Sequence, residues 1–188
     1  MALDSLRDLY VEQLKDLYSA ESQILQALPK MAAKAKHADL RSGFELHQRQ
    51  TQEHVRRLEQ LFERLGERPG GVTCEGMKGL LKEGEKTMKE RADSDVLDAA
   101  LIADAQRVEH YEIAGYGCVR TYARMLGRQD DVSLLQQTLD EEGATDEKLT
   151  QLAERVVNLD AAQGDRAATG AAAARSSALS GESGMEAR

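Results

Sequence analysis

Side chains that could bind a metal ion recur in four separate stretches of the sequence. Each stands where a helix would face its neighbours. Carboxylates and imidazoles on facing helices are the ligands with which helical bundles hold iron or manganese. Thirty-three residues separate Glu21 from His54, and the same number separates Glu109 from Glu142. This equal spacing indicates one helical hairpin used twice. The candidate ligands are Glu21, Glu53, His54, Glu109, Glu112, Glu142 and Asp146.

Four long amphipathic helices would position these side chains, because apolar residues recur at alternating steps of three and four. The first helix is predicted to begin near Asp4 or Ser5 and to continue to residue 36, and the second covers 40–65 and ends at Gly66. The third covers 95–126, and the fourth begins after residue 130. The predicted inward face of the fourth is Leu135, Thr138, Glu142, Thr145, Leu149, Leu152, Val156 and Leu159.

Residues 67–94 separate the two predicted hairpins. This segment is too long for a tight turn and contains a short amphipathic stretch interrupted by glycines. We therefore expect an all-α fold, a ferritin-like antiparallel four-helix bundle with a long crossover that carries a short extra helix between the second and third helices. Residues 1–160 would form this bundle domain. Residues 161–188 form an Ala/Gly/Ser-rich tail with little to bury, and we expect it to be disordered.

Several carboxylates in one dry layer must be protonated, paired or bound to a cation. The predicted inward faces contain no Lys or Arg, so we expect a pair of metal ions there, although a long side chain from a flanking position could reach in. His47 lies one heptad from His54, roughly 10 Å along the helix axis. We expect it to be a satisfied core histidine or a supporting group. Glu53 fits a ligand and a solvated surface charge equally well.

Composition narrows the classes of function. The chain has 188 residues, 4% aromatic residues, no Trp and a formal net charge of −8, which argues against binding to nucleic acid or to an anionic membrane. Cys74 and Cys118 fit no metal-binding or redox spacing and are expected to be free thiols. The N-terminal segment lacks the features of a signal peptide, so we expect a cytoplasmic location.

Three segments resemble the YciE/YciF family of ferritin-like bacterial stress proteins: "LKDLYSAESQILQALPKMA", "DAALIADAQRVEHYEIAGYG" and "TLDEEGATDEKLTQLA". The resemblance covers about residues 3–158. It implies a homodimer, an association with stress responses and a dinuclear metal site, by analogy with rubrerythrin-like proteins. The matching motifs contain Glu21, Glu109, Glu112, Glu142 and Asp146. In the second helix the chain departs from its relatives, because "HQRQTQEH" carries Gln50 and Gln52 where relatives are rich in glutamate.

Two hypotheses of function follow from these observations. In the first, the chain is a stress protein that holds two iron ions, or manganese, and reacts with a small oxidant, either oxygen or peroxide. In the second, it is a non-enzymatic dimer with a degenerate metal layer that acts by binding a partner or ligand. Whether the protein is an enzyme stays open at this point.

Overall fold

The computed structural model describes residues 3–163, all in helices and short connections. The part of the expected tail from residue 164 onward lies outside this range. The elements are α1 (Leu6–Lys34), α2 (Ala38–Leu65), α3 (Glu75–Thr87), α4 (Ser94–Met125), α5 (Gln129–Leu152) and a π-helical turn η1 (Ala153–Val157). Residues 158–163 continue as helix after η1.

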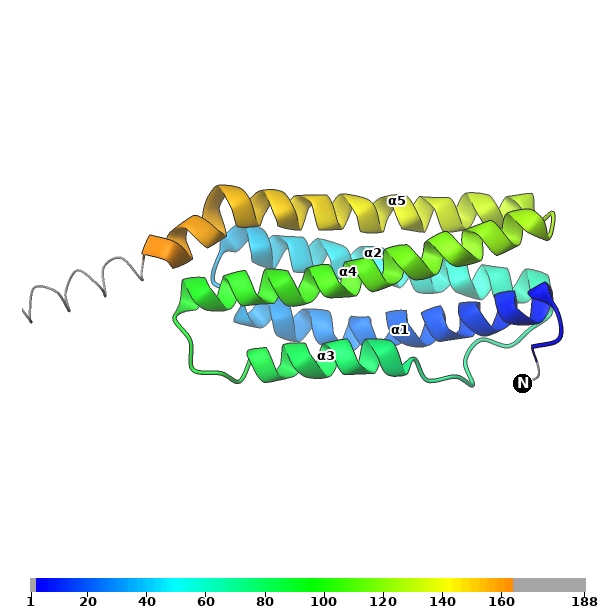
Figure 1. The fold of residues 1–188 in the computed structure, drawn as a ribbon, viewed down its shortest axis with the longest axis horizontal. Helices are drawn as coiled ribbons and strands as arrows, with labels where there is room; N and C mark the ends of the chain where they lie inside the picture. The colour runs from blue at the N-terminus through cyan, green and yellow to red at the C-terminus, as the bar shows by residue number, and fades with distance from the viewer. Residues whose placement is uncertain (1–2, 164–188) are drawn as a thin grey trace, which may run out of the picture.

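The four long helices form two antiparallel hairpins, α1 with α2 and α4 with α5 (Figure 1). The long connection between α2 and α4 carries the short helix α3, which packs along the outside of α1 and α4. This arrangement is the ferritin-like bundle with a crossover helix that the sequence predicts.

Local sequence accounts for the helix ends. Ser5 accepts a hydrogen bond from the Asp8 backbone N–H at 3.1 Å and caps α1, which settles the choice between the two predicted caps. Beside the start of α1, α2 stops at Gly66, whose φ of 66° is the left-handed conformation typical of glycine after a helix. The Cys74 thiol caps α3, accepting from the Met77 N–H.

The hydrophobic core is divided into two clusters along the bundle. One is built around Ile24, Phe44 and Ile102, towards the connection between α1 and α2. The other is built around Leu14, Phe62 and Val119, towards the connection between α4 and α5. Buried charged residues, Glu21 and Glu142 among them, occupy the level between the two clusters. The apolar faces therefore hold the helices together on both sides of a polar layer.

The inward face of the last helix differs from the prediction at its C-terminal end. Leu135, Thr138, Glu142 and Leu149 are buried as expected, but Leu159 is 55% exposed. The reason is η1, because a π-helical turn closes i→i+5 hydrogen bonds and so contains more residues than an α-helical turn. The buried face consequently shifts to Ala153 and Val157.

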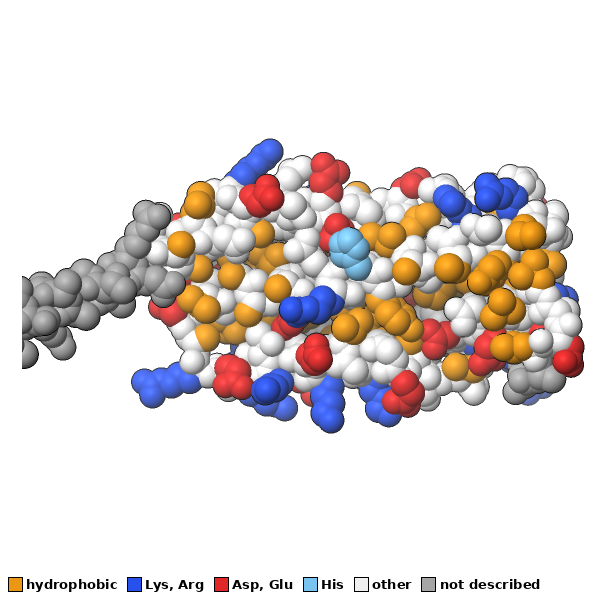
Figure 2. All heavy atoms as spheres, viewed as in Figure 1, with side chains coloured by type: hydrophobic (Ala, Val, Ile, Leu, Met, Phe, Trp, Pro, Cys, Tyr) orange, Lys and Arg blue, Asp and Glu red, His pale blue; other side chains and the backbone are white. Residues whose placement is uncertain are grey.

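Charges of both signs are interspersed over the face of the molecule in Figure 2, with hydrophobic side chains between them and no broad basic area. None of the helices in residues 3–163 combines the length and hydrophobicity that a membrane crossing requires.

Two glycines in α4 have different surroundings. A Cβ atom built on Gly115 would lie 2.8 Å from Leu17 Cδ2 of α1, whereas one on Gly117 would meet no heavy atom within 4 Å. Gly115 therefore allows α1 and α4 to approach closely beside the polar layer, and Gly117 does not serve this contact.

We expect Gly117→Ala to raise the free energy of unfolding by about 0.5–1 kcal/mol, because alanine favours the helix. Gly115→Ala should gain less or lose stability, since the buried Leu17 side chain must move. Urea denaturation of both variants measures the difference, and equal gains would contradict the close contact.

Candidate metal centre

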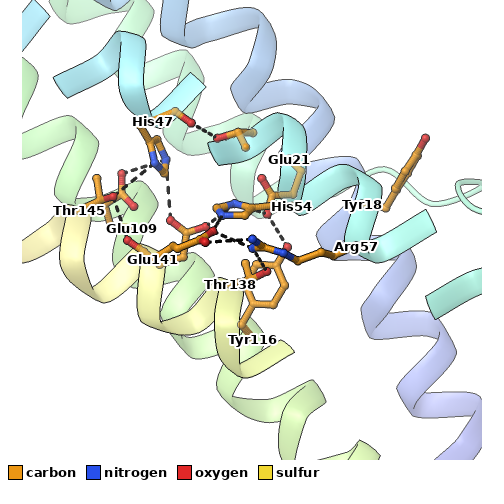
Figure 3. Close-up of polar contacts among 12 residues, drawn as sticks. Tyr18, Glu21, His47, His54, Arg57, Glu109, Tyr116, Thr138, Glu141 and Thr145 are labelled. Atoms are coloured by element: carbon orange, nitrogen blue, oxygen red, sulfur yellow. Dashed lines mark hydrogen bonds and ion pairs between the residues drawn. The ribbon is translucent and has the colours of Figure 1, made fainter. Parts of the chain in front are cut away.

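Six buried side chains converge at the middle of the bundle. We call this set the polar layer, and Figure 3 shows its two imidazoles directed at carboxylates of the facing helices. α1 supplies one residue of the layer, α2 and α4 supply two each, and α5 supplies one. The members are Glu21, His47, His54, Glu109, Glu112 and Glu142.

The layer contains two groups of ligand atoms that share one residue. His47, Glu109, Glu112 and Glu142 each offer an atom such that all four atoms lie within 4.8 Å of one another. The same criterion joins Glu21, His54 and Glu142. The His47 and His54 ring centroids are 6.3 Å apart. Two adjoining positions with Glu142 between them are thus available to cations.

The chemistry of these atoms fits metal binding. Among the described residues, both carboxylate oxygens of Glu112 and of Glu142 are buried without a hydrogen-bond partner, as are Glu21 Oε2 and Glu109 Oε2. His47 Nε2 and His54 Nδ1 also form no hydrogen bond, although each lies within ion-pair distance of a carboxylate of the layer. Buried polar atoms almost always have partners, since leaving them unpaired costs free energy. Oxygen and imidazole ligands of this kind suit iron, manganese or zinc.

His54 provides the positive charge closest to the carboxylates. Its Nδ1 lies 2.9 Å from Glu142 Oε1 and 3.4 Å from Glu21 Oε1. Burial disfavours the imidazolium, but these two carboxylates outweigh burial and raise the pKa of His54 to about 10. Without a metal, His54 is therefore protonated at neutral pH.

A pair on the outer side of the layer fixes the orientation of His54. His54 Nε2 lies 2.9 Å from Glu141 Oε2, and Arg57 donates to both oxygens of Glu141 at 2.7 and 2.9 Å. Burial acts to raise the pKa of Glu141, but the Arg57 and His54 contacts prevail and hold it below its ordinary value. Arg57 also donates to Thr138 Oγ1 at 3.0 Å. A cation from a flanking position thus reaches inward, but it pairs with Glu141 rather than with the layer.

The remaining carboxylates differ in their affinity for protons. Burial, followed by the repulsion of neighbouring carboxylates, raises the pKa values of Glu109 and Glu112 well above the ordinary 4.5. Burial also raises the pKa of Glu21. Glu142 differs, because the contact with His54 and the proximity of His47 outweigh burial and lower its pKa. Protons therefore neutralise much of the layer when no cation is bound.

His47 lies in the layer, whereas the sequence predicted a satisfied core histidine or a supporting group. Its Nε2 lies 3.4 Å from Glu109 Oε1 and 3.8 Å from Glu142 Oε2. His47 and His54 are separated along the helix axis, but their side chains converge on carboxylates long enough to bridge the interval. Burial lowers the pKa of His47, which favours the neutral form that binds metals. The signal in the sequence was two histidines seven residues apart on one inward face.

The structure does not bring Glu53 and Asp146 into the layer. The Glu53 side chain is 51% exposed and pairs with Arg56 on the surface of α2. Asp146 lies on the flank of α5 facing α4, where it accepts from Gln106 at 3.1 Å and lies 3.4 Å from the exposed His110. Glu53 is adjacent to His54 in sequence, and helical geometry turns it about 100° away from that inward position. Asp146 lies one turn from Glu142, but its side chain is held by Gln106 of α4.

Tyr116 is a further member of the surroundings that the ligand pattern did not reveal. Its hydroxyl is buried and donates to Glu21 Oε1. Burial and the adjacent Glu21 raise the pKa of Tyr116 well above its ordinary value, so it remains a donor. Tyr18, in contrast, points away from the layer and donates to Glu59 at 3.2 Å (Figure 3).

We expect Glu141→Ala to lower the free energy of unfolding of the metal-free protein by about 1–3 kcal/mol, because it leaves His54 Nε2 buried without a partner. Glu59→Ala removes the exposed partner of Tyr18 between α1 and α2 and should cost less than about 1 kcal/mol. Urea denaturation measures both. An equal loss in the two variants would show that Glu141 has no special relation to His54.

Comparisons with known proteins agree with this architecture. Residues 5–162 match the family described as "Domain of unknown function (DUF892)". Protein YciF of Escherichia coli (strain K12) is 40% identical over 159 residues, which are 84% of this chain and 96% of YciF.

Solved structures give the same picture. The crystal structure of the E. coli stress protein YciF matches with a TM-score of 0.80 and 40% identity, over 82% of this chain and 98% of that one. YcfI from Rhodopseudomonas palustris matches with a TM-score of 0.77 and 46% identity, over 79% and 94% of the two chains. The chain therefore belongs to the DUF892 family and is a relative of the stress protein YciF.

Proposed function

We propose that this protein binds two metal ions, iron or manganese, in the polar layer, and that it acts on oxygen or peroxide in a stress response. The observation that carries the proposal is the pair of adjoining ligand groups that share Glu142. The similarity to a stress protein supports the physiological setting. The bound ions would supply the redox chemistry, and every other contribution comes from the side chains of the layer.

Those side chains have distinguishable roles. Glu142 lies between the two groups, with Glu21 and His54 on one side and His47, Glu109 and Glu112 on the other. Glu141 and Arg57 hold the His54 ring so that Nδ1 faces the layer. Partners of this kind orient a ligating histidine and increase its basicity. Tyr116 holds Glu21 in the same manner through its hydroxyl.

The alternative function is a non-enzymatic stress protein in which protons alone neutralise the layer. One observation favours it, because the ion pair of His54 with Glu142 already compensates one carboxylate without a metal. In that case Glu142→Leu should be neutral or stabilising, since apolar residues often replace buried ion pairs without loss. Under the metal-binding function, Glu142→Leu loses the metal.

A homodimer in the cytoplasm completes the proposal. Hydrophobic side chains such as Leu46, Val96 and Met125 are exposed, and a second copy could cover some of them. Cys74 and Cys118 are both free thiols, which agrees with a reducing compartment.

The metal content of protein purified from cells supplied with iron tests the proposal. We expect about two metal ions per chain, because the layer offers two adjoining positions. A Glu109→Ala, Glu142→Ala double variant and His47→Ala should lower metal affinity by about 10-fold or more, since both remove ligands. Glu53→Ala and Asp146→Ala are matched controls outside the layer and should retain the wild-type content. Less than about a tenth of an ion per chain, unchanged in the double variant, would remove the proposal.

The pKa shifts give a pH dependence with a defined sign. The folded-state pKa values of Glu109 and Glu112 lie above 4.5, and that of His54 is raised from 6.5 to about 10. The folded protein therefore holds more protons than the unfolded chain between these limits. We expect the stability of the metal-free protein to fall as pH rises from about 4.5 towards 10.

A bound cation displaces these protons, so its stabilising effect should increase with pH. Thermal unfolding with and without Mn²⁺ at about pH 6 and about pH 8 measures the difference, and we expect the larger increase in Tm at the higher pH. The Glu109→Ala, Glu142→Ala variant should show no increase at either pH. A larger increase at the lower pH would contradict the proton displacement.

A further inference from the structure

A cavity of about 400 Å³ opens between α2 and the C-terminal part of α5 with η1. It is the size of a site for a small organic molecule. Its inner wall includes His47 and Glu109, so the cavity connects the surface with one side of the polar layer. Most of its lining is apolar, and the apolar wall is formed by Leu40, Phe44, Leu46, Leu149, Leu152 and Val156.

The inner end of the cavity carries buried polar atoms that form no hydrogen bond. His47 Nε2 and Glu109 Oε2 are buried, and neither forms a hydrogen bond within the described part of the chain. Both side chains are about 97% buried, and both line the cavity. The end nearest the layer therefore offers no cation to an anionic head group, whereas the wall around it favours an apolar group.

The charges where the cavity opens have the opposite sign. Lys148 and Arg155 line it and are exposed, and within residues 3–163 neither lies within 4.0 Å of a carboxylate. Asp39 is the one exposed acidic side chain in the lining, so the cations outnumber it. η1 supplies Arg155 and Val156 to this wall, and π-helical turns frequently occur at functional sites.

We propose that this cavity binds an organic carboxylate with an apolar chain, as the substrate of the polar layer. The chain would lie against Phe44 and Leu149, and the carboxylate would lie at the opening beside Lys148 and Arg155. This orientation follows from charge, because the only unpaired cations in the lining are at the opening. The substrate role rests on the proposed function, but the binding does not, since the cavity exists without a metal.

Decanoate serves as the probe, titrated calorimetrically into full-length protein from which a chelator has removed metal. We expect decanoate to bind at least about tenfold more tightly than decyltrimethylammonium, which has the same chain and the opposite charge. Acetate, which has the head group alone, should bind no better than decyltrimethylammonium. Equal binding of decanoate and decyltrimethylammonium would overturn the assignment of the carboxylate to the opening.

Gly43→Phe tests the location of the ligand. Gly43 lines the cavity on an exposed face of α2, and a Cβ atom there meets nothing within 4 Å, so the ring can fill the cavity without straining the helix. We expect an affinity loss of about tenfold or more. Gly79→Phe places the same ring at an exposed position of α3 with equally open surroundings and should leave the affinity unchanged. Unchanged affinity in Gly43→Phe would overturn the proposal.

Charge variants test the head group. Lys148→Gln with Arg155→Gln should weaken decanoate binding about tenfold, while Lys78→Gln on α3 should not. If decanoate does not bind and Gly43→Phe converts a dimer to monomers, this face is an interface between copies and the proposal is wrong.

Because decanoate binding is measured without metal, failure of the cavity site can be distinguished from failure of the proposed metal function. Decanoate binding without metal content leaves the cavity site standing and removes the metal function, and the reverse result removes only the cavity site.

Discussion

The burial of four carboxylates among apolar helices is the constraint on which the rest of this structure depends. Such groups are stable only with protons, counter-charges or metal ions, and the bundle provides for all three. His54 supplies a counter-charge within the layer, the raised pKa values of Glu109 and Glu112 retain protons, and Glu142 joins two groups of potential ligands. The apolar clusters on either side keep the helices in register at this level. Stability thus comes from the two ends of the bundle, while the middle holds the polar layer at a cost in stability.

Much of the fold follows from the sequence because four long helices repeat a strong apolar pattern. The inward faces of α1 and α2 are buried as their periodicity predicts, and the crossover helix appears where the pattern is interrupted. The failure at Leu159 has a definite cause, since periodicity assumes 3.6 residues per turn and η1 does not obey it. No residue type in Ala153–Val157 predicts a π-helical turn, so only the structure could show it.

The candidate site was predictable in its carboxylates and less so in its histidines. Glu21, Glu109, Glu112 and Glu142 were identifiable because each is an acid at an otherwise apolar position. The place of His47 beside Glu109 did not follow from its spacing along the helix axis, because that spacing does not give the distance between side-chain tips, which depends on rotamers and on the length of the bridging groups. The Arg57 contact to Glu141 lies outside any inward pattern, and only the packing of α2 against α5 reveals it.

The close approach of Leu17 to Gly115 has a consequence for the geometry of the polar layer. It sets how closely α1 and α4 approach, one turn of helix from both Glu21 and Glu112. The distance between those two carboxylates is therefore governed by a position that contributes no ligand atom. A larger residue there would push α1 and α4 apart and change the separation of these carboxylates. A residue without a side chain thus sets the spacing of two acids to which it contributes no atom.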